Sequence, residues 1–275
     1  MDLDYMRWVL WLITPVIIVL LLPLIIMILL YGSALFLTIH KHRHRLYEVL
    51  ESRDVWEGAR CALASFWDAW GWLWHGYELE GLEKIPDRGS AMLVYYHGAI
   101  PVDFYYMAAK IILHKRRNMK VIGDRFLFKV PGWKLLMEVF NVIPGSQDSC
   151  VELLNQGELM GVSPGGVREA MFSDENYTIL WGRRSGFAKV ALRANAPVYP
   201  VFTMNVRETF RYLHIGFFKS LLKKFYDMYK LPLLPPYGNF PVYIKTFIGD
   251  PVPYNSDTSA EVLASEVSVI DVSIS

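Results

Sequence analysis

His97 and Asp103 carry the side chains that base-assisted attack by an alcohol requires. A neutral imidazole held by a carboxylate on one nitrogen exposes the other nitrogen as a general base. Six positions of continuous helix would place the two side chains about 240° apart, so they meet only if His97 lies in a loop that folds back. Gly98 and Pro101 permit such a loop, with Pro101 first and Asp103 third in the next helix. The alternative interpretation is a histidine that only makes a structural hydrogen bond.

A second candidate is the segment Ser163-Pro164-Gly165-Gly166-Val167-Arg168-Glu169-Ala170. Gly165 and Gly166 allow backbone N–H groups to approach an anion or a developing oxyanion closely. Arg168 adds a fixed positive charge suited to a phosphate group of a ligand. The alternative is a plain turn between a strand and a helix.

Other charged side chains are weaker candidates. Asp124 and Arg125 are expected to organise an acceptor pocket, with a structural ion pair as the alternative. Lys189, Arg183 and Arg184 could contact the same phosphates as Arg168, or be solvated, and we expect two of these three on the surface.

In their order along the chain, these blocks resemble the four motifs of the glycerolipid acyltransferase superfamily, which includes lysophospholipid and diacylglycerol acyltransferases. The resemblance runs from about residue 75 to about residue 260. Besides His97 with Asp103 and the Ser163–Ala170 block, it rests on Gly123-Asp124-Arg125-Phe126 leading into Val130-Pro131-Gly132, and on Gly186-Phe187-Ala188-Lys189-Val190-Ala191 leading into Ala196-Pro197-Val198-Tyr199-Pro200-Val201-Phe202.

The resemblance implies an α/β fold with a mixed central sheet flanked by helices, and a membrane-bound enzyme of the endoplasmic reticulum. It implies acyl transfer with acyl-CoA as co-substrate, and neither a cofactor nor a metal. His97 and Asp103 would be catalytic. The substrate-binding residues would be Asp124, Arg125, Gly165, Gly166, Arg168, Glu169 and Lys189.

Two departures from the family pattern bear on the substrate. Five residues separate His97 from Asp103, where the family has four, and this affects how the two side chains can pair. Members that use phosphate-bearing acceptors carry a glutamate at the position of Gly165, and the Gly-Gly pair followed by Glu169 resembles the branch that acylates neutral glycerides. Arg168 matches the family arginine. We therefore expect a mono- or diacylglycerol acceptor.

The expected reaction is one direct step. His97, oriented by Asp103, takes the proton of a glycerol hydroxyl that attacks the thioester of a fatty acyl-CoA, and di- or triacylglycerol forms. A phospholipid could replace acyl-CoA as donor. The alternatives are a lysophospholipid or glycerol-phosphate acyltransferase, and a catalytically silent scaffold that binds lipid. A lipid hydrolase is disfavoured because neither Cys61 nor Cys150 is preceded or followed by an activating histidine.

Composition limits the function classes. The 275 residues carry a net charge of +1, which argues against nucleic acid as a partner. Apolar residues make up 53% of the chain, and the excess lies near the N-terminus, so the bilayer is the expected partner together with donor and acceptor lipids. Protein partners are not predicted. Cys61 and Cys150 are expected to be free thiols in a reducing compartment.

Residues 8–39 lack any charged side chain. As one straight helix they would measure roughly 48 Å, against a hydrocarbon core of about 30 Å. Because Pro15 and Pro23 interrupt the run, a tilted or kinked single span and a hairpin of two helices are both compatible with it. The run is too long for a cleavable signal peptide.

The hexad His40-Lys41-His42-Arg43-His44-Arg45 places the following chain in the cytosol by the positive-inside rule. A metal tract is disfavoured because alternating cations repel a metal ion. The aromatic residues of 52–80 predict an amphipathic helix at the membrane interface, and packing into the domain core is the alternative. Asn176-Tyr177-Thr178 is a glycosylation sequon that must stay bare in a cytosolic domain.

Alternation of short apolar runs with helical stretches predicts the elements that position the candidate residues. Strands are expected at 91–96, 119–123, 159–163, 198–202 and 242–248, and helices at 101–113, 133–140 and 184–195. The expected regions are an anchor with its basic collar (1–47), the interfacial helix (48–80), the catalytic domain (81–256) and a tail (257–275). In the tail, alternating β-branched residues at 267–274 are poor helix formers, and a truncated or alternative end is one interpretation.

Overall fold

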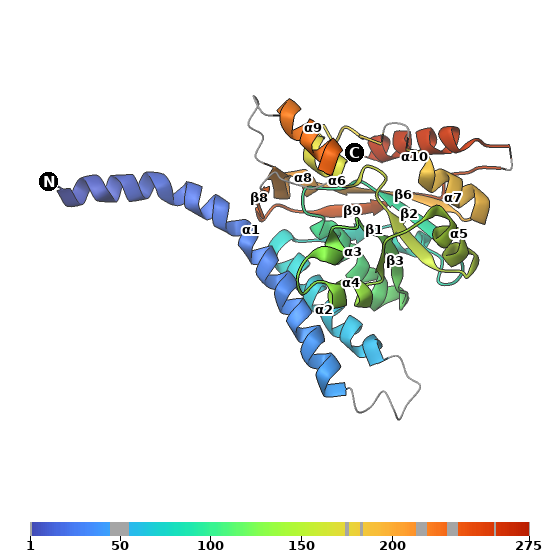
Figure 1. Cartoon of the computed structure of the whole chain (residues 1–275), viewed down its shortest axis with the longest axis horizontal. Helices are drawn as coiled ribbons and strands as arrows, with labels where there is room; N and C mark the ends of the chain where they lie inside the picture. The colour runs from blue at the N-terminus through green and yellow to red at the C-terminus, as the bar shows by residue number, and fades with distance from the viewer. Residues whose placement is uncertain are drawn as a thin grey trace.

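A seven-stranded mixed sheet is the centre of the protein (Figure 1). The structure is a computed structural model that describes residues 2–44, 55–173, 176–181, 184–212, 219–229, 236–255 and 257–274. The strand order is β1-β9-β6-β2-β5-β3-β4, and neighbouring strands run parallel except β6 and β9. These strands are β1 (Glu78–Glu80), β2 (Ala91–Tyr95), β3 (Met119–Ile122), β4 (Val142–Ile143), β5 (Leu159–Val162), β6 (Val198–Met204) and β9 (Lys245–Ile248). The expected fold class is confirmed.

Helices cover both faces of this sheet. The α-helices are α1 (Asp2–His44), α2 (Val55–His75), α3 (Val102–Lys110), α4 (Lys134–Val139), α5 (Gln147–Asn155), α6 (Gly166–Phe172), α7 (Gly186–Ala194), α8 (Val206–Thr209), α9 (Lys219–Tyr229) and α10 (Ala260–Ile274). A π-helical turn (Ile111–Lys115) continues α3, and 3-10 turns lie at Leu82–Lys84 and Leu127–Lys129. Strands β7 (Phe210–Tyr212) and β8 (Pro236–Gly238) form a separate antiparallel pair.

The alternation of side chains along β2 builds two cores. Met92 and Val94 face the layer of α5, α7 and α10, whereas Leu93 and Tyr95 face the layer of α3. All five residues of β2 are buried, as expected for a central parallel strand covered by helices on both faces. The carboxyl end of β2 is therefore a fixed platform for the residues that follow it.

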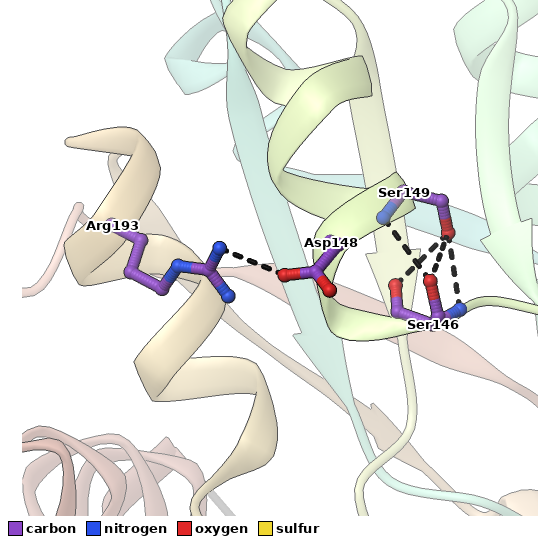
Figure 2. A network of polar contacts seen from close by, with 4 residues as sticks. All are labelled: Ser146, Asp148, Ser149 and Arg193. Carbon is purple, nitrogen blue, oxygen red and sulfur yellow. Dashed lines mark hydrogen bonds and ion pairs between the residues drawn. The ribbon is translucent and has the colours of Figure 1, made fainter.

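The start of α5 is fixed to α7 and to its own cap (Figure 2). Nη2 of Arg193 in α7 lies 2.8 Å from Oδ1 of Asp148 in α5. Ser146 Oγ accepts a hydrogen bond from Ser149 N–H, and Ser149 Oγ accepts one from Ser146 N–H, which forms a capping box. The ion pair is exposed and adds little stability, whereas such a cap typically contributes about 1 kcal/mol.

Helix α1 is one continuous helix, so the alternative of a hairpin of two helices is wrong. The helix contains Pro15 and Pro23, it bends along its course, and its N-terminal half projects away from the domain (Figure 1). The stretch Tyr5–His42 is long and apolar enough to cross a membrane by length and composition. Arg45 of the basic hexad lies outside the described residues.

The two halves of α1 have different surroundings. In the first half the large apolar side chains are exposed, with Trp11 at 72% and Leu20 at 59%. In the second half, residues at helical spacing pack against the domain near α2, α4 and β8, namely Ile26, Leu30, Ala34 and Leu37. Asn239, which follows β8, donates a hydrogen bond to the Leu22 carbonyl at 3.3 Å. Only the first half is therefore exposed on all sides.

Helix α2 divides its aromatic residues between the core and the surface. Trp67 is 1% exposed and stacks on Tyr105 of α3 with ring centroids 4.9 Å apart, whereas Trp72 is 71% exposed and Leu73 is 69% exposed. The face with Trp67 therefore packs into the core, and the exposed face with Trp72 and Leu73 leaves the membrane-interface interpretation a prediction. Residues 48–54 of the proposed interfacial region lie outside the described residues.

The prediction for the tail was wrong in one respect: α10 is helical through to Ile274. Ala260, Leu263 and Val267 recur at helical spacing and are buried against the layer of α5 and α7. This burial outweighs the weak helix propensity of the β-branched residues.

Strands β2, β3, β5 and β6 and helices α3, α4 and α7 lie where the sequence predicts them, with ends shifted by one to three residues. Strand β9 begins only at Lys245, because Val242 to Ile244 form no ladder. Described elements without a predicted range include the short strands β1, β4, β7 and β8 and the helices α5, α6, α8 and α9.

Candidate active site

The candidate residues gather at one edge of the sheet because three neighbouring strands end there. Strands β5, β2 and β6 are parallel and adjacent, with Val94 in register with Val162 and Tyr95 with Val201. His97 follows β2, the Ser163 block follows β5, and Arg207 of α8 follows β6. The carboxyl ends of parallel strands meet at a single edge, which is where open α/β sheets hold ligands.

His97 is held in one tautomer by its own loop. The ring Nδ1 lies 2.7 Å from the Gly98 carbonyl oxygen, which can only accept, so Nδ1 carries the proton. Nε2 makes no hydrogen bond with any described residue and presents its lone pair. Burial lowers the pKa of His97, while the Gly98 carbonyl and the charge of Asp124 partly oppose that effect. The imidazole is therefore neutral near pH 7, as a general base requires.

Asp103 lies in a different environment from His97. Helix α3 begins at Val102, with Pro101 as its N-cap, so each lies one position earlier in the helix than predicted and Asp103 is the second helical residue. Asp103 is 4% exposed, and its Oδ1 has no hydrogen-bond partner among the described residues. No hydrogen bond joins it to His97 in the described part of the chain. The Gly98 carbonyl thus performs the orienting role that the sequence assigned to Asp103.

A chain of buried hydroxyls leads to the Asp103 carboxylate. Tyr77 donates to Thr246 Oγ1 at 3.0 Å, and Thr246 Oγ1 lies 2.9 Å from Thr203 Oγ1. The Thr203 hydroxyl is the side-chain donor to Asp103. Burial raises the pKa of Asp103 to about 6, and the hydrogen bond from Thr203 and those from the first turn of α3 oppose the rise.

Glu169 is the carboxylate that contacts the His97 main chain. It is 0% exposed; Oε2 accepts the His97 N–H at 3.1 Å and Oε1 accepts the Leu180 N–H at 3.0 Å. Burial raises the pKa of Glu169 to about 7, opposed by these two donors and by the charges of Arg207 and Arg184. Both of its oxygens are therefore engaged by the backbone.

The glycine pair opens α6 beneath this carboxylate. Gly166 has a φ of +52°, a conformation that glycine adopts without strain. Arg184 is exposed, and its Nη1 donates to the carbonyls of Pro164 and Gly165 at 3.0 Å each. Arg168 is half-buried and makes no hydrogen bond or ion pair with any described residue. Arg183 lies outside the described residues.

Asp124, Arg125 and Lys189 are exposed. Asp124 accepts the Phe126 N–H at 3.3 Å and acts electrostatically on His97, so it lies on the same side of the site. No ion pair joins Asp124 to Arg125 among the described residues, which removes the structural alternative for these two. The structure does not bring Arg125 or Lys189 into contact with His97, and their substrate-binding roles stay predictions.

Arg207 and two tyrosines were missed by the sequence analysis. Arg207 donates to the Tyr96 hydroxyl at 2.5 Å and to the Ser173 carbonyl at 2.8 Å. The Tyr177 ring packs on Tyr96 with centroids 5.4 Å apart, and its hydroxyl donates to Glu208 at 2.6 Å. The available signal was an arginine three positions after the end of β6, a strand predicted to be buried, with an asparagine directly after that strand. Among the described residues, no group of three or more His, Cys, Asp or Glu could hold a metal ion.

Comparison with known proteins relates this chain to acyltransferases. The family model described as "Acyltransferase" matches residues 76–204. A solved structure, the 1-acyl-sn-glycerophosphate (LPA) acyltransferase PlsC from Thermotoga maritima, matches with a TM-score of 0.55 at 20% identity, over 88% of this chain and 92% of that one. This likeness shows the fold.

Curated relatives match over nearly the whole chain. The Homo sapiens "DGAT1/2-independent enzyme synthesizing storage lipids" is 47% identical over 96% of this chain and 80% of its own length. The Gallus gallus protein of the same description is 44% identical, again over 96% of this chain and 79% of its own length. A more distant relative is "Phytyl ester synthase 1, chloroplastic" from Arabidopsis thaliana, 24% identical over 59% of this chain and 23% of its own length. The chain therefore belongs to the acyltransferase family, in its glycerolipid branch.

Proposed function

We propose that this protein is a membrane-bound O-acyltransferase that moves a fatty acyl group from acyl-CoA to a hydroxyl of mono- or diacylglycerol. The observation that carries the proposal is the state of His97. Its Nδ1 proton is committed to the Gly98 carbonyl, its pKa is lowered by burial, and its Nε2 has no hydrogen-bond partner among the residues that the structure describes. A neutral base with a free lone pair is what abstraction of an alcohol proton needs.

In the proposed step, Nε2 of His97 takes the proton of the acceptor hydroxyl while the oxygen attacks the thioester carbonyl. A C–O bond forms, the C–S bond breaks, and the thiolate of coenzyme A leaves with the proton from His97. Backbone N–H groups beside Gly165 and Gly166 stabilise the oxyanion, and Arg168 holds a phosphate of coenzyme A. Among described residues Arg168 has no competing ion pair, which supports this assignment.

Asp103 is kept in the proposal as the carboxylate partner of His97. Its Oδ1 is buried without a hydrogen-bond partner among the described residues. Pairing requires the His97 ring to leave the Gly98 carbonyl and donate to Oδ1 when the substrates bind. Catalytic hydrogen bonds are often incomplete before substrate binding.

The choice of a neutral acceptor rests on two observations. The storage lipids in the description of the curated relatives are the products that acylation of diacylglycerol would give. At Gly165, moreover, the protein has no side chain to receive a charged headgroup, and the nearby Glu169 carboxylate is engaged by backbone N–H groups. A phospholipid donor in place of acyl-CoA is compatible with the same site.

The exposed half of α1 supports an anchor in the bilayer, and we place the protein in the endoplasmic reticulum with its catalytic domain in the cytosol. The sequon at Asn176 tests the orientation. We expect it to stay bare in microsomes, while a sequon added ahead of Met1 acquires a glycan. A glycan at Asn176 would place the domain in the lumen and contradict the proposal.

The activity is tested with labelled fatty acyl-CoA and membranes that contain the protein. We expect label in di- or triacylglycerol, loss of that label in His97→Ala, and no change in His114→Ala, because His114 is an exposed histidine far from the proposed chemistry. Protein amounts and thermal melting temperatures should match in all three preparations.

Each other outcome selects an alternative. Label in phosphatidic acid that depends on His97 would identify a lysophospholipid or glycerol-phosphate acyltransferase. If no label depends on His97, the same assay with labelled phospholipid decides between a phospholipid donor and a silent lipid-binding scaffold.

A further inference from the structure

Glu169 joins three parts of the site that are distant in sequence. Its Oε2 accepts the N–H of His97, 72 positions away, and its Oε1 accepts the N–H of Leu180, 11 positions away. The side chain is 0% exposed, so neither oxygen is open to solvent. A buried carboxylate with both oxygens engaged by fixed backbone donors is rigid and has little capacity left for a substrate.

The backbone at Gly165 leaves room for this carboxylate. A Cβ atom at position 165 would lie 2.3 Å from Glu169 Cδ and 2.4 Å from Oε2. These distances are far below van der Waals contact, so any side chain at 165 must displace the carboxylate. The pair of a glycine at 165 and a glutamate at 169 is therefore one structural unit.

The same unit is held from its other side by Arg184. This side chain donates to the carbonyls of Pro164 and Gly165, which fixes the turn against which the carboxylate packs. The positive charges of Arg184 and Arg207 also favour the ionised form of Glu169. Burial of the carboxylate is thus offset by two donors and two cations.

We propose that Glu169 is a positioning residue, which clamps the His97 backbone to the Gly165 turn and to Leu180 and thereby fixes where the catalytic imidazole stands, and that it is not a ligand of the acceptor. This inference rests on the proposed function, and it replaces the substrate-binding role that the family resemblance implies for Glu169. It predicts that Glu169 affects turnover and leaves acceptor binding unchanged.

The first test compares Glu169→Gln with Glu152→Gln, a matched change at an exposed glutamate. A glutamine amide can accept only one of the two backbone hydrogen bonds. A lost hydrogen bond to a charged group corresponds to about a 10- to 100-fold fall in kcat. We expect that fall with an unchanged KM for diacylglycerol, in a protein that stays folded and melts a few degrees lower because one buried N–H has lost its acceptor. A raised KM with an unchanged kcat would show that Glu169 binds the acceptor.

The second test is a double-mutant cycle at the two positions of the unit. Gly165→Ala should lower kcat as Glu169→Ala does, because the added methyl group displaces the carboxylate. In the Glu169→Ala background the same Gly165→Ala change should have almost no further effect. Fully additive effects of the two substitutions would contradict the inference that a side chain at 165 and the Glu169 carboxylate compete for the same space.

Hydrogen exchange provides a readout that needs no activity. At least one of the His97 and Leu180 amides should lose protection in Glu169→Gln, and both should keep it in Glu152→Gln. If this loss occurs in a protein without acyltransferase activity, the clamp stands and the proposed function fails. If protection is unchanged in Glu169→Gln, the clamp is wrong whatever the activity.

Discussion

Replacing Thr203 by valine should move the acid limb of the pH–rate profile upward. Thr203 is 3% exposed and ends the hydroxyl chain from Tyr77 through Thr246 at the Asp103 carboxylate. Valine keeps the shape of the side chain and removes the donor. The ionised form of Asp103 then loses a hydrogen bond, and because only the charged form gains from that bond, the pKa of Asp103 must rise.

The size of the shift follows from the strength of the bond. A hydrogen bond to a charged group contributes about 1.5–3 kcal/mol, which corresponds to about 1–2 pKa units. The pKa of Asp103 starts at about 6. In the variant it should reach roughly 7–8, so about one tenth to one half of Asp103 would be ionised at pH 7.

Few other groups near Asp103 can produce the same shift. The titratable side chains that act on it electrostatically are Tyr77, Tyr95 and Tyr106, and burial raises the pKa of all three, so they stay neutral across the assay range. Burial lowers the pKa of His97, and its hydrogen bonds do not include Thr203. A shift in the variant therefore reports on Asp103.

The assay is the initial rate of acyl transfer between pH 5 and pH 9, at saturating donor and acceptor. Thr209→Val is the matched control, since Thr209 is also buried and its hydroxyl donates to the Asn205 carbonyl. We expect the acid limb of the pH–rate profile to move to higher pH in Thr203→Val and to stay in place in Thr209→Val. An unmoved limb in a folded Thr203→Val protein, or an equal shift in the control, would refute a catalytic requirement for ionised Asp103.

Three further predictions concern stability, measured by unfolding in detergent micelles. Because the pKa of Asp103 is raised from 3.8 to about 6, wild type should lose about 3 kcal/mol relative to Asp103→Asn as pH rises through this window, and a constant difference would contradict that pKa. Trp67→Ala should cost about 3–5 kcal/mol, whereas Trp72→Ala should change little; equal losses would contradict the observed burial. Leu37→Ala should cost about 2–5 kcal/mol and Leu20→Ala almost nothing. Equally small losses for both would contradict the packing of the second half of α1 against the domain.

Strands and helices were predictable from the sequence where their pattern of apolar residues extended over enough positions. Strands β2 and β6 are runs of buried apolar residues, and both lie where the sequence predicts them. Strand β4 has two residues and β1 has three, and such short elements carry no pattern. In α10, tertiary burial of Leu263 and Val267 overrode local propensity, which a propensity scale cannot anticipate.

For the candidate site, the sequence predicted the types of residue better than it predicted which residues contact one another. The sequence places His97 after a strand and puts a carboxylate near it, and the structure brings Glu169 to the His97 backbone. The observed orienting acceptor is a main-chain carbonyl, that of Gly98, which leaves no trace in residue identity. Arg207 lies 111 positions from its partner Tyr96, so only the parallel pairing of β2 and β6 brings the two together.

The uninterrupted course of α1 has a mechanical consequence. A helix that leaves the bilayer and continues along the domain without a flexible joint cannot swivel against it. Under the proposed anchoring, any tilt of the transmembrane half carries the sheet with it as a rigid lever. The edge that holds His97 then keeps one position and one orientation relative to the transmembrane half of α1. Substrates must reach this edge by diffusing in the leaflet, because the domain cannot change its orientation relative to α1 to approach them.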